Sequence, residues 1–304
     1  PEEIAFVPNT STGINAIADL IDGDGAVLTD TLEFPTVTLP FVHRGCDVRF
    51  VEPRHDGALV AGDFCPARCA GCATLLVSHV QFSNGCRQDL DAFGTIKGSR
   101  HLIVCGSQSA GAFPIDVRRS RIDAFATAGH KWLCAGYGAG FVYIGRDLLQ
   151  RRPRMMGWLS VKAPFSFDNR RYDLLDSAQR IEMGCPPFAQ IFALGAAVEF
   201  LAGVGLDRIA GRVLSLNTYL TDGLARLGVP VLSPGGAHRS GETLCGFPHP
   251  AHVVGFLAER NIQVTEKPEG IRVATHFYND EQDVDRLVSA LREYRAPARG
   301  TPAL

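Results

Sequence analysis

Residues 121–143 constrain this chain more than any other segment does. An apolar run ends in Gly129-His130-Lys131, and a loop with glycines at 136, 138 and 140 leads into a second apolar run. A lysine between two buried strands needs an explanation, because an ammonium group is costly to bury unless it is paired or neutral. A desolvated lysine loses its proton and forms a Schiff base with a carbonyl compound, which would make Lys131 catalytic. The segment alone is equally compatible with a surface lysine at a strand end.

Short apolar runs alternate with longer amphipathic runs through the first half of the chain. This alternation, with strands that are apolar throughout, predicts an α/β fold with a mostly parallel sheet covered on both faces. The predicted strands are residues 26–29, 48–51, 74–78, 101–105, 122–126 and 140–144. The predicted helices between them include residues 13–21, 36–43 and 89–96.

The second half of the chain has a different pattern. Two long helices are predicted at 187–201 and 206–227, followed by a smaller α+β region. In that region we expect strands at 243–247, 262–265 and 270–275 and helices at 252–260 and 280–294. With 304 residues, of which 46% are hydrophobic, the chain can build more than one core. We therefore predict a large domain over 1–180, linking helices over 181–230 and a small C-terminal domain over 231–304.

Composition argues against several classes of partner. The net charge is −2, from 30 basic and 32 acidic residues, so we expect no nucleic-acid partner. The longest apolar runs are too short to cross a bilayer, so we expect no membrane partner. Nine cysteines without a secretory signal predict reduced thiols and a cytoplasmic location.

Cysteine and histidine spacings offer only weak metal signals. Cys65, Cys69 and Cys72 have a spacing similar to that of the iron–sulfur site in radical enzymes. No fourth ligand is evident, however, and the cluster runs directly into a predicted buried strand. The pair His249 and His252 is a weaker signal still. We predict no metal site and attribute the cluster to the cysteine-rich composition.

Several segments resemble motifs of the class V aminotransferases, the pyridoxal-phosphate (PLP) family that includes cysteine desulfurases, kynureninase and isopenicillin N epimerase. The lysine segment resembles the family's lysine signature. The segment His-Leu-Ile-Val-Cys-Gly-Ser-Gln-Ser-Ala-Gly at 101–111 resembles "V-D-x-x-Q-S-x-G", and 78–85 resembles "S-H-V-x-x-x-x-G". Residues 180–186 resemble "R-F-E-x-G-T-P", and 270–279 resemble "G-x-R-x-S-x-x-x-Y-N". The similarity runs from about residue 8 to 291, in the family order, and implies fold type I with a PLP cofactor.

The resemblance also implies a role for individual residues. Lys131 would carry the cofactor as a Schiff base, with His130 beside it. Gln108 would hydrogen-bond the phenolic oxygen of the cofactor, and Arg272 would bind the α-carboxylate of a small amino-acid substrate. Phe34 would stack on the cofactor ring, as an aromatic residue does in kynureninase.

The phosphate group is expected at the start of the first predicted helix. The sequence Asn-Thr-Ser-Thr-Gly-Ile-Asn at 9–15 places small hydroxyl residues there, and free N–H groups at a helix N-terminus bind phosphate. Ser11 and Thr12 are the candidates, although an ordinary helix cap would look the same.

Three positions depart from the family pattern. Cys105 stands where the family has the aspartate that pairs with the pyridine nitrogen, and a thiol carries no charge unless ionised. Ala128 and Cys185 replace a serine and a threonine that bind the phosphate, for which Thr127 is a substitute candidate. The family's N-terminal segment, which precedes the 9–15 turn, is also absent from the sequence.

Two hypotheses follow. The first is a homodimeric PLP enzyme that acts on an amino acid by transamination, elimination with C–S cleavage, or racemisation. The second is a PLP-fold protein with lost or altered catalysis that serves as a binding partner, to which Cys105 points. Persulfide chemistry is disfavoured, because residues 246–271 contain no cysteine and Cys245 lies in an apolar run.

Overall fold

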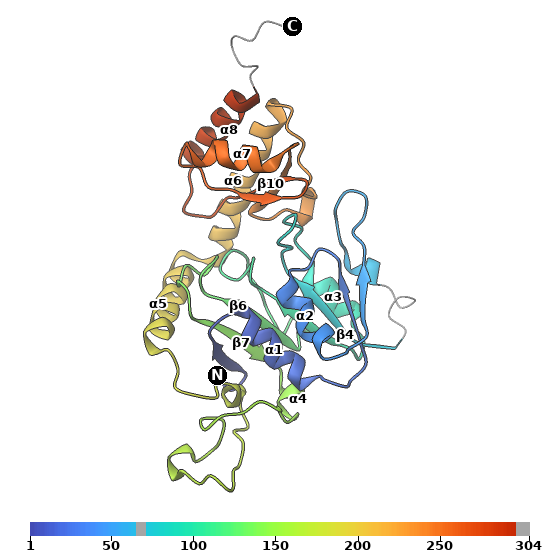
Figure 1. Cartoon of the computed structure of the whole chain (residues 1–304), viewed down its shortest axis with the longest axis vertical. Helices are drawn as coiled ribbons and strands as arrows, with labels where there is room; N and C mark the ends of the chain where they lie inside the picture. Colours follow the sequence, from blue (N-terminus) through green and yellow to red (C-terminus); the bar gives the residue numbers. More distant parts are fainter. Residues whose placement is uncertain (65–70, 296–304) are drawn as a thin grey trace, which may run out of the picture.

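The computed structural model describes residues 1–64 and 71–295 of the chain. A seven-stranded sheet has the strand order β1-β7-β6-β5-β4-β2-β3, and a separate three-stranded sheet has the order β8-β10-β9. The smaller sheet lies above the larger one in Figure 1, and helix α6 runs between them. The α/β class predicted from the alternating pattern is confirmed.

The seven-stranded sheet is mostly parallel. Strands β2 to β6 pair in parallel, whereas β7 pairs antiparallel with both β6 and β1. The strands are β1 (Ile4–Val7), β2 (Ala26–Asp30), β3 (Val48–Val51), β4 (Cys72–Ser78), β5 (His101–Cys105), β6 (Ala124–Ala128) and β7 (Gly140–Ile144). All six predicted strands are confirmed, and β1 is an addition.

Strand β6 begins two residues later than predicted, for a local reason. Arg121 adopts a positive φ of 52°, which turns the chain before the strand. The Asp123 carboxylate then accepts hydrogen bonds from the Leu102 amide and from Lys97. As a result β6 ends at Ala128, and Gly129-His130-Lys131 follows immediately.

Helices cover both faces of the large sheet, as predicted. On one face α1 (Thr10–Leu20) and α2 (Pro35–His43) bury Ile14, Ile17 and Phe41 against the strands. The other face packs against α3 (Leu90–Ile96), α5 (Phe188–Val204) and α6 (Leu206–Arg226), with Phe93 and Leu201 in its core. Helix α4 (Arg146–Leu149) is a single turn after β7.

Helices α5 and α6 meet at a sharp bend. Gly205 separates them with φ 93°, a backbone conformation that favours glycine, and the helix axes differ by 79°. Within residues 1–64 and 71–295 no single helix is long and apolar enough to cross a membrane; only the bent pair α5 and α6 reaches that length and composition together.

The three-stranded sheet is antiparallel and carries two helices. Its elements are β8 (Glu242–Gly246), α7 (Pro250–Ala258), β9 (Thr265–Lys267), β10 (Gly270–Ala274) and α8 (Glu281–Arg295). The strand predicted at 262–265 is wrong, since the chain is extended into the sheet only from Thr265. Asn261 has a positive φ of 57°, and the Ile262 amide bonds back to Leu257 to close α7.

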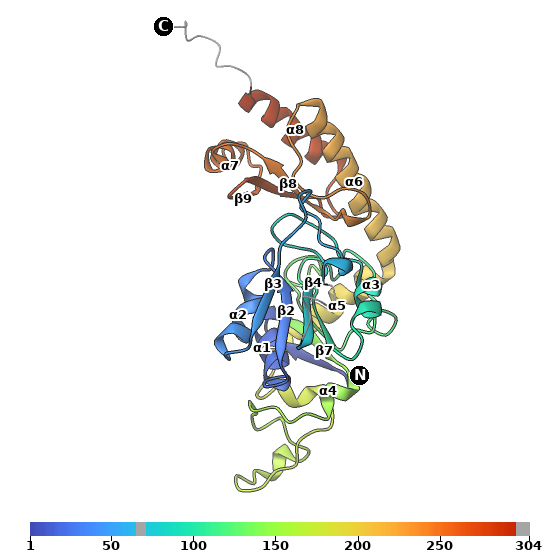
Figure 2. The ribbon, with the colours of Figure 1, turned by 90° about the vertical axis from the view of Figure 1, so that its right-hand side faces the viewer.

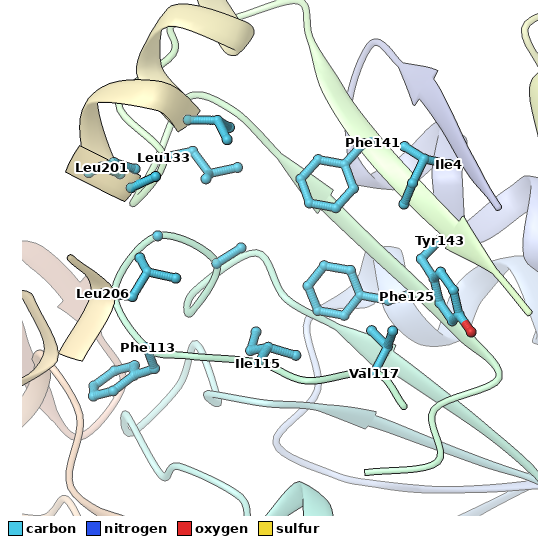
Figure 3. A pocket seen from close by; sticks show the side chains of 14 residues that line it. Ile4, Phe113, Ile115, Val117, Phe125, Leu133, Phe141, Tyr143, Leu201 and Leu206 are labelled. Carbon is cyan, nitrogen blue, oxygen red and sulfur yellow. The ribbon is translucent and has the colours of Figure 1, made fainter. Parts of the chain in front are cut away.

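An apolar cavity of about 290 Å³ lies between the large sheet and the α5–α6 bend. Figure 3 shows Phe125 and Phe141 from the sheet beside Ile115, with Leu201 and Leu206 from the two helices. Its labelled walls are hydrocarbon except for the Tyr143 hydroxyl. The described lining of this cavity offers no charged side chain to a phosphate group.

The weak metal signals can be placed as follows. Cys65 and Cys69 lie outside the described residues, while Cys72 is buried at the start of β4 near Arg49. The His249 and His252 rings lie 5.8 Å apart. Among the residues that the structure describes, no three histidine, cysteine or acidic side chains are grouped to hold a metal ion.

Candidate active site

A cavity of about 240 Å³, lined by both apolar and polar side chains, opens where the parallel strands end and α1 begins. Open α/β sheets bind their ligands at this edge, outside the carboxyl ends of the strands. Six predicted site residues line it: Ser11, Phe34, Cys105, Gln108, His130 and Lys131. Two other predicted site residues, Thr12 and Arg272, are not among the described residues that line the cavity.

Lys131 lies at the end of β6 and is reached from this cavity. The Lys131 side chain is exposed to solvent rather than buried between the strands, as its place in the sequence had suggested. Desolvation by the neighbouring protein still lowers its pKa, and the charge of Arg272 lowers it further. Glu242 and Cys105 oppose this shift. A lowered pKa leaves more of the amine neutral, which is the nucleophilic form.

Gln108 is held by an unpredicted partner, Trp132. The indole Nε1 donates a hydrogen bond to the Gln108 Oε1 over 3.3 Å, so the amide NH₂ of Gln108 stays available as a donor. Trp132 is buried and stacks on His276 with ring centroids 4.6 Å apart. Its position directly after Lys131 is the only sequence signal that pointed to it.

The start of α1 contributes hydroxyl groups, but not the predicted pair. Asn9 caps the helix by accepting from the amide of Thr12 at 2.9 Å and from its hydroxyl at 3.2 Å. Thr12 is therefore occupied in the cap, and Thr10 lines the cavity instead. The Ser11 hydroxyl bonds to that of Thr36 at 2.7 Å. The first amides of a helix have no helical acceptor, so they can bind an anion here.

Phe34 forms an aromatic wall of the cavity. Its ring is 49% exposed and meets Phe82 edge to face, with centroids 4.9 Å apart. Phe34 directly precedes α2, where Pro35 fixes the chain direction. The exposed face of Phe34 leaves room for a flat ring.

Cys105 remains a neutral thiol in this environment. Burial raises its pKa, and the negative charge of Glu33 raises it further. The thiol donates to the Ser107 hydroxyl at 3.4 Å. A thiolate that could pair with a pyridinium is therefore disfavoured.

A carboxyl group nevertheless lies near Cys105, because Ser78, the neighbour of Cys105 in the sheet, hydrogen-bonds to Glu33. Glu33 is buried and accepts bonds from Ser78 and from Gln81, and burial raises its pKa to about 7. Ser78 lines the cavity and pairs in register with Cys105 across β4 and β5. The sequence reasoning missed Glu33, although it directly precedes Phe34.

The remaining family positions lie as follows. His130 stacks on Tyr137 at 4.6 Å, and burial followed by the charge of Lys131 lowers its pKa. Thr127 is fully buried in β6, Ala128 is buried beside it, and neither lines the cavity. Cys185 is exposed and also lies outside the cavity walls of the described chain.

Arg272, on β10 of the three-stranded sheet, contacts the cavity wall at Phe82 without lining the cavity, and a second unpredicted acid lies beside it. Its guanidinium donates to the backbone carbonyl of Phe82, and its Nη1 lies 3.4 Å from the Glu242 Oε2. Glu242 is buried, and burial raises its pKa to about 7 against the lowering charges of Arg272, Lys131 and Lys267. The site therefore joins residues of both sheets.

Comparisons with known proteins identify relatives of this chain and of its fold. The family model described as aminotransferase class-V matches residues 1–287. The chain is 26% identical to an uncharacterized aminotransferase, YcbU, of Bacillus subtilis over 96% of this chain and 79% of that protein. It is 25% identical to a probable cysteine desulfurase of Pyrococcus abyssi, with the same two coverages. The apo structure of a cysteine desulfurase from Thermococcus onnurineus superposes with a TM-score of 0.88 at 24% identity, covering 96% of this chain and 79% of that one.

Proposed function

This chain belongs to the class V aminotransferase family of PLP-dependent enzymes, and from that premise we propose that it transforms a small amino acid through a Schiff base at Lys131. One observation carries the proposal: Lys131, with its lowered pKa, shares one cavity with Phe34, Gln108 and the start of α1. These are the groups needed to hold a flat, phosphorylated aldehyde beside an amine.

The residues of the cavity fit PLP. Phe34 offers an exposed aromatic face, and the Gln108 amide offers a donor oriented by Trp132. Thr10, Ser11 and the first amides of α1 would hold the phosphate. Ser78 and Cys105 line the wall on which the ring nitrogen would lie.

When bound, PLP supplies an electron sink for a carbanion next to the substrate nitrogen. Lys131 would hold the cofactor, and its free amine would move the proton at the substrate Cα as general base. Arg272 orients the substrate by binding its carboxylate. Glu33, which accepts a hydrogen bond from the Ser78 hydroxyl, would supply an acidic group behind the wall that faces the ring nitrogen.

Two thiols of the three-stranded sheet and the lysine loop, Cys245 and Cys134, do not favour persulfide transfer. Cys245 is fully buried in β8, and burial raises its pKa to about 12. Cys134 is exposed, 3.7 Å from the His276 Nε2, but burial raises its pKa and lowers that of His276 to about 4. Neither thiol ionises readily in this environment. We therefore propose that the reaction proceeds by proton transfer at Cα of the substrate and not by persulfide transfer.

We also propose a homodimer. Helix α5 leaves Phe188, Phe192 and Phe200 exposed by 63%, 75% and 59%. Exposed apolar surface of this extent on a folded chain is typical of a protein–protein interface.

The alternative function, a family member without catalysis, is supported by the neutral thiol of Cys105. Both functions allow PLP to bind, but only the enzyme requires a reactive lysine at the site.

The test is reduction of the PLP-loaded protein with borohydride, followed by peptide mass mapping. We expect the pyridoxyl label on Lys131, its loss in Lys131→Ala, and its retention in the matched control Lys267→Ala. Label elsewhere, or none at saturating PLP, would refute the role of Lys131. Exchange of the Cα proton of bound amino acids in D₂O then separates the enzyme from the inactive alternative.

A further inference from the structure

Glu242 and Arg272 lie on the same face of the three-stranded sheet. Arg272 pairs in register with Leu244, and Ala274 pairs with Glu242, so the two charged residues are diagonal neighbours across β8 and β10. Long side chains at such positions can meet. Here they do, with 3.4 Å between Arg272 Nη1 and Glu242 Oε2.

Glu242 is buried among cations and is incompletely hydrogen-bonded. Its side chain is 2% exposed, and the charges of Arg272, Lys131 and Lys267 all act on it. In the described residues its Oε2 has no hydrogen-bond donor, and the Arg272 Nε has no acceptor. The two side chains therefore form an ion pair in which Glu242 Oε2 can still accept a hydrogen bond and Arg272 Nε can still donate one.

This contact occupies the group that a substrate carboxylate would use. An arginine binds a carboxylate best through two parallel hydrogen bonds, and a second carboxylate beside it would repel the first. An amino acid would therefore have to displace or neutralise Glu242, whereas an amine without a carboxylate would not.

We propose that Glu242 is a specificity-determining residue: it competes with the substrate carboxylate for Arg272 and lowers the preference of the site for amino acids over amines. This inference rests on the proposed function, since it assumes that substrates enter at Lys131. It concerns binding alone and requires no further reactant.

The proposal makes specificity depend on pH. Burial raises the pKa of Glu242 to about 7, so the carboxylate is mostly protonated at pH 6 and ionised at pH 8.5. The charged groups that face it are Arg272 from β10, Lys267 from β9 and Lys131 after β6. Lowering the pH therefore releases Arg272 and favours the carboxylate ligand.

The experiment compares two probes that condense with the PLP aldehyde and change its absorbance. Aminooxyacetate carries a carboxylate, and O-methylhydroxylamine is its counterpart without one. In the PLP-loaded protein at pH 8.5, Glu242→Gln should tighten aminooxyacetate about tenfold or more, the scale of one charged hydrogen bond, and leave O-methylhydroxylamine within about twofold. The exposed Glu266→Gln on neighbouring β9 is the matched control and should change neither affinity.

Equal effects on both probes, or weaker binding of aminooxyacetate in Glu242→Gln, would overturn the proposal. A pH series on the unmutated protein tests it without a variant. The preference for aminooxyacetate should rise from pH 8.5 to pH 6, and a flat ratio would contradict it. If the protein takes up PLP normally but its preference for aminooxyacetate does not change with pH or with Glu242→Gln, only this inference is refuted. Failure to bind PLP refutes the proposed function and this inference with it.

Discussion

Ser78 satisfies both oxygens of the Glu33 carboxylate. Its hydroxyl donates to Oε2 and its backbone amide donates to Oε1, each over 2.5 Å. The contact joins the end of β4 to the segment after β2, 45 residues earlier in the chain. It gives the buried acid a donor on each oxygen, and Gln81 adds a third hydrogen bond at Oε1.

Replacing Ser78 with alanine should therefore destabilise the fold. The variant leaves the Glu33 Oε2 without its hydroxyl donor, and an unsatisfied buried polar group costs about 1–3 kcal/mol. Urea unfolding of the protein without PLP measures the change. Ser83→Ala is the matched control, because the Ser83 hydroxyl makes only a 3.3 Å bond to the Leu32 carbonyl. A difference between the two variants of less than about 0.5 kcal/mol would contradict the role assigned to Ser78.

Cys105→Asp should lower the free energy of unfolding as long as Glu33 is present. A second carboxylate beside a buried one raises the pKa of both and lowers the free energy of unfolding, by about 2 kcal/mol or more at pH 8. In the double variant with Glu33→Gln, we expect a coupling free energy of at least about 1 kcal/mol. Cys105→Asn is the uncharged control and should show little coupling with Glu33→Gln. Additive effects of Cys105→Asp and Glu33→Gln would show that the two positions do not interact.

Because His79 is buried, the free energy of unfolding should decrease as the pH is lowered. Burial, followed by the charge of Arg87, lowers its pKa to about 3 from 6.5, so only the unfolded chain takes up its proton between these values. The free energy of unfolding is therefore lost as pH falls below about 6.5, by up to about 1.4 kcal/mol per pH unit from this residue. Urea unfolding at pH 4.5 to 7.5 should give a steeper loss for the unmutated protein than for His79→Gln. Parallel profiles would mean that His79 titrates alike in both states.

Phe192→Asp should weaken the proposed dimer. A charge on the exposed apolar side of α5 cannot be buried against a second copy without a partner. Size-exclusion chromatography with light scattering should show a shift from dimer towards monomer. Val231→Asp, at an exposed apolar position near the three-stranded sheet, is the control and should leave the mass unchanged. Persistence of the dimer in Phe192→Asp would exclude this side of α5 from the interface.

The sheet was predictable because most of its strands are predominantly apolar and alternate with amphipathic helices. The strand β1 was missed, since its place in the sheet depends on antiparallel pairing with β7, far along the chain. The choice of Thr12 over Thr10 failed for a similar reason. Two residues turn a helix by about 200°, so which hydroxyl faces the cavity depends on how α1 packs.

The acids of the site could not be predicted from local sequence. A single glutamate among mixed residues normally indicates a solvated position, and its burial is decided by distant partners. Glu33 is buried through Ser78, and Glu242 through Arg272, which lies 30 residues further along the chain. Arg272 itself was identified by its flanking residues, but its pairing with Glu242 depends on the register of β8 with β10.

The bend at Gly205 determines where the chain can accept inserted or deleted residues between the two sheets. Helix α6 connects α5, which packs on the large sheet, to the three-stranded sheet (Figure 2), and Arg272 lies on β10 of that sheet. One residue inserted within α6 would rotate everything beyond it by about 100° and separate the arginine from the lysine. At Gly205 the helical hydrogen-bond ladder is already interrupted, so an inserted residue can be absorbed as loop. We therefore expect insertions and deletions to be tolerated at this joint and excluded from α6, which makes Gly205 the place to vary the spacing of the two sheets by design.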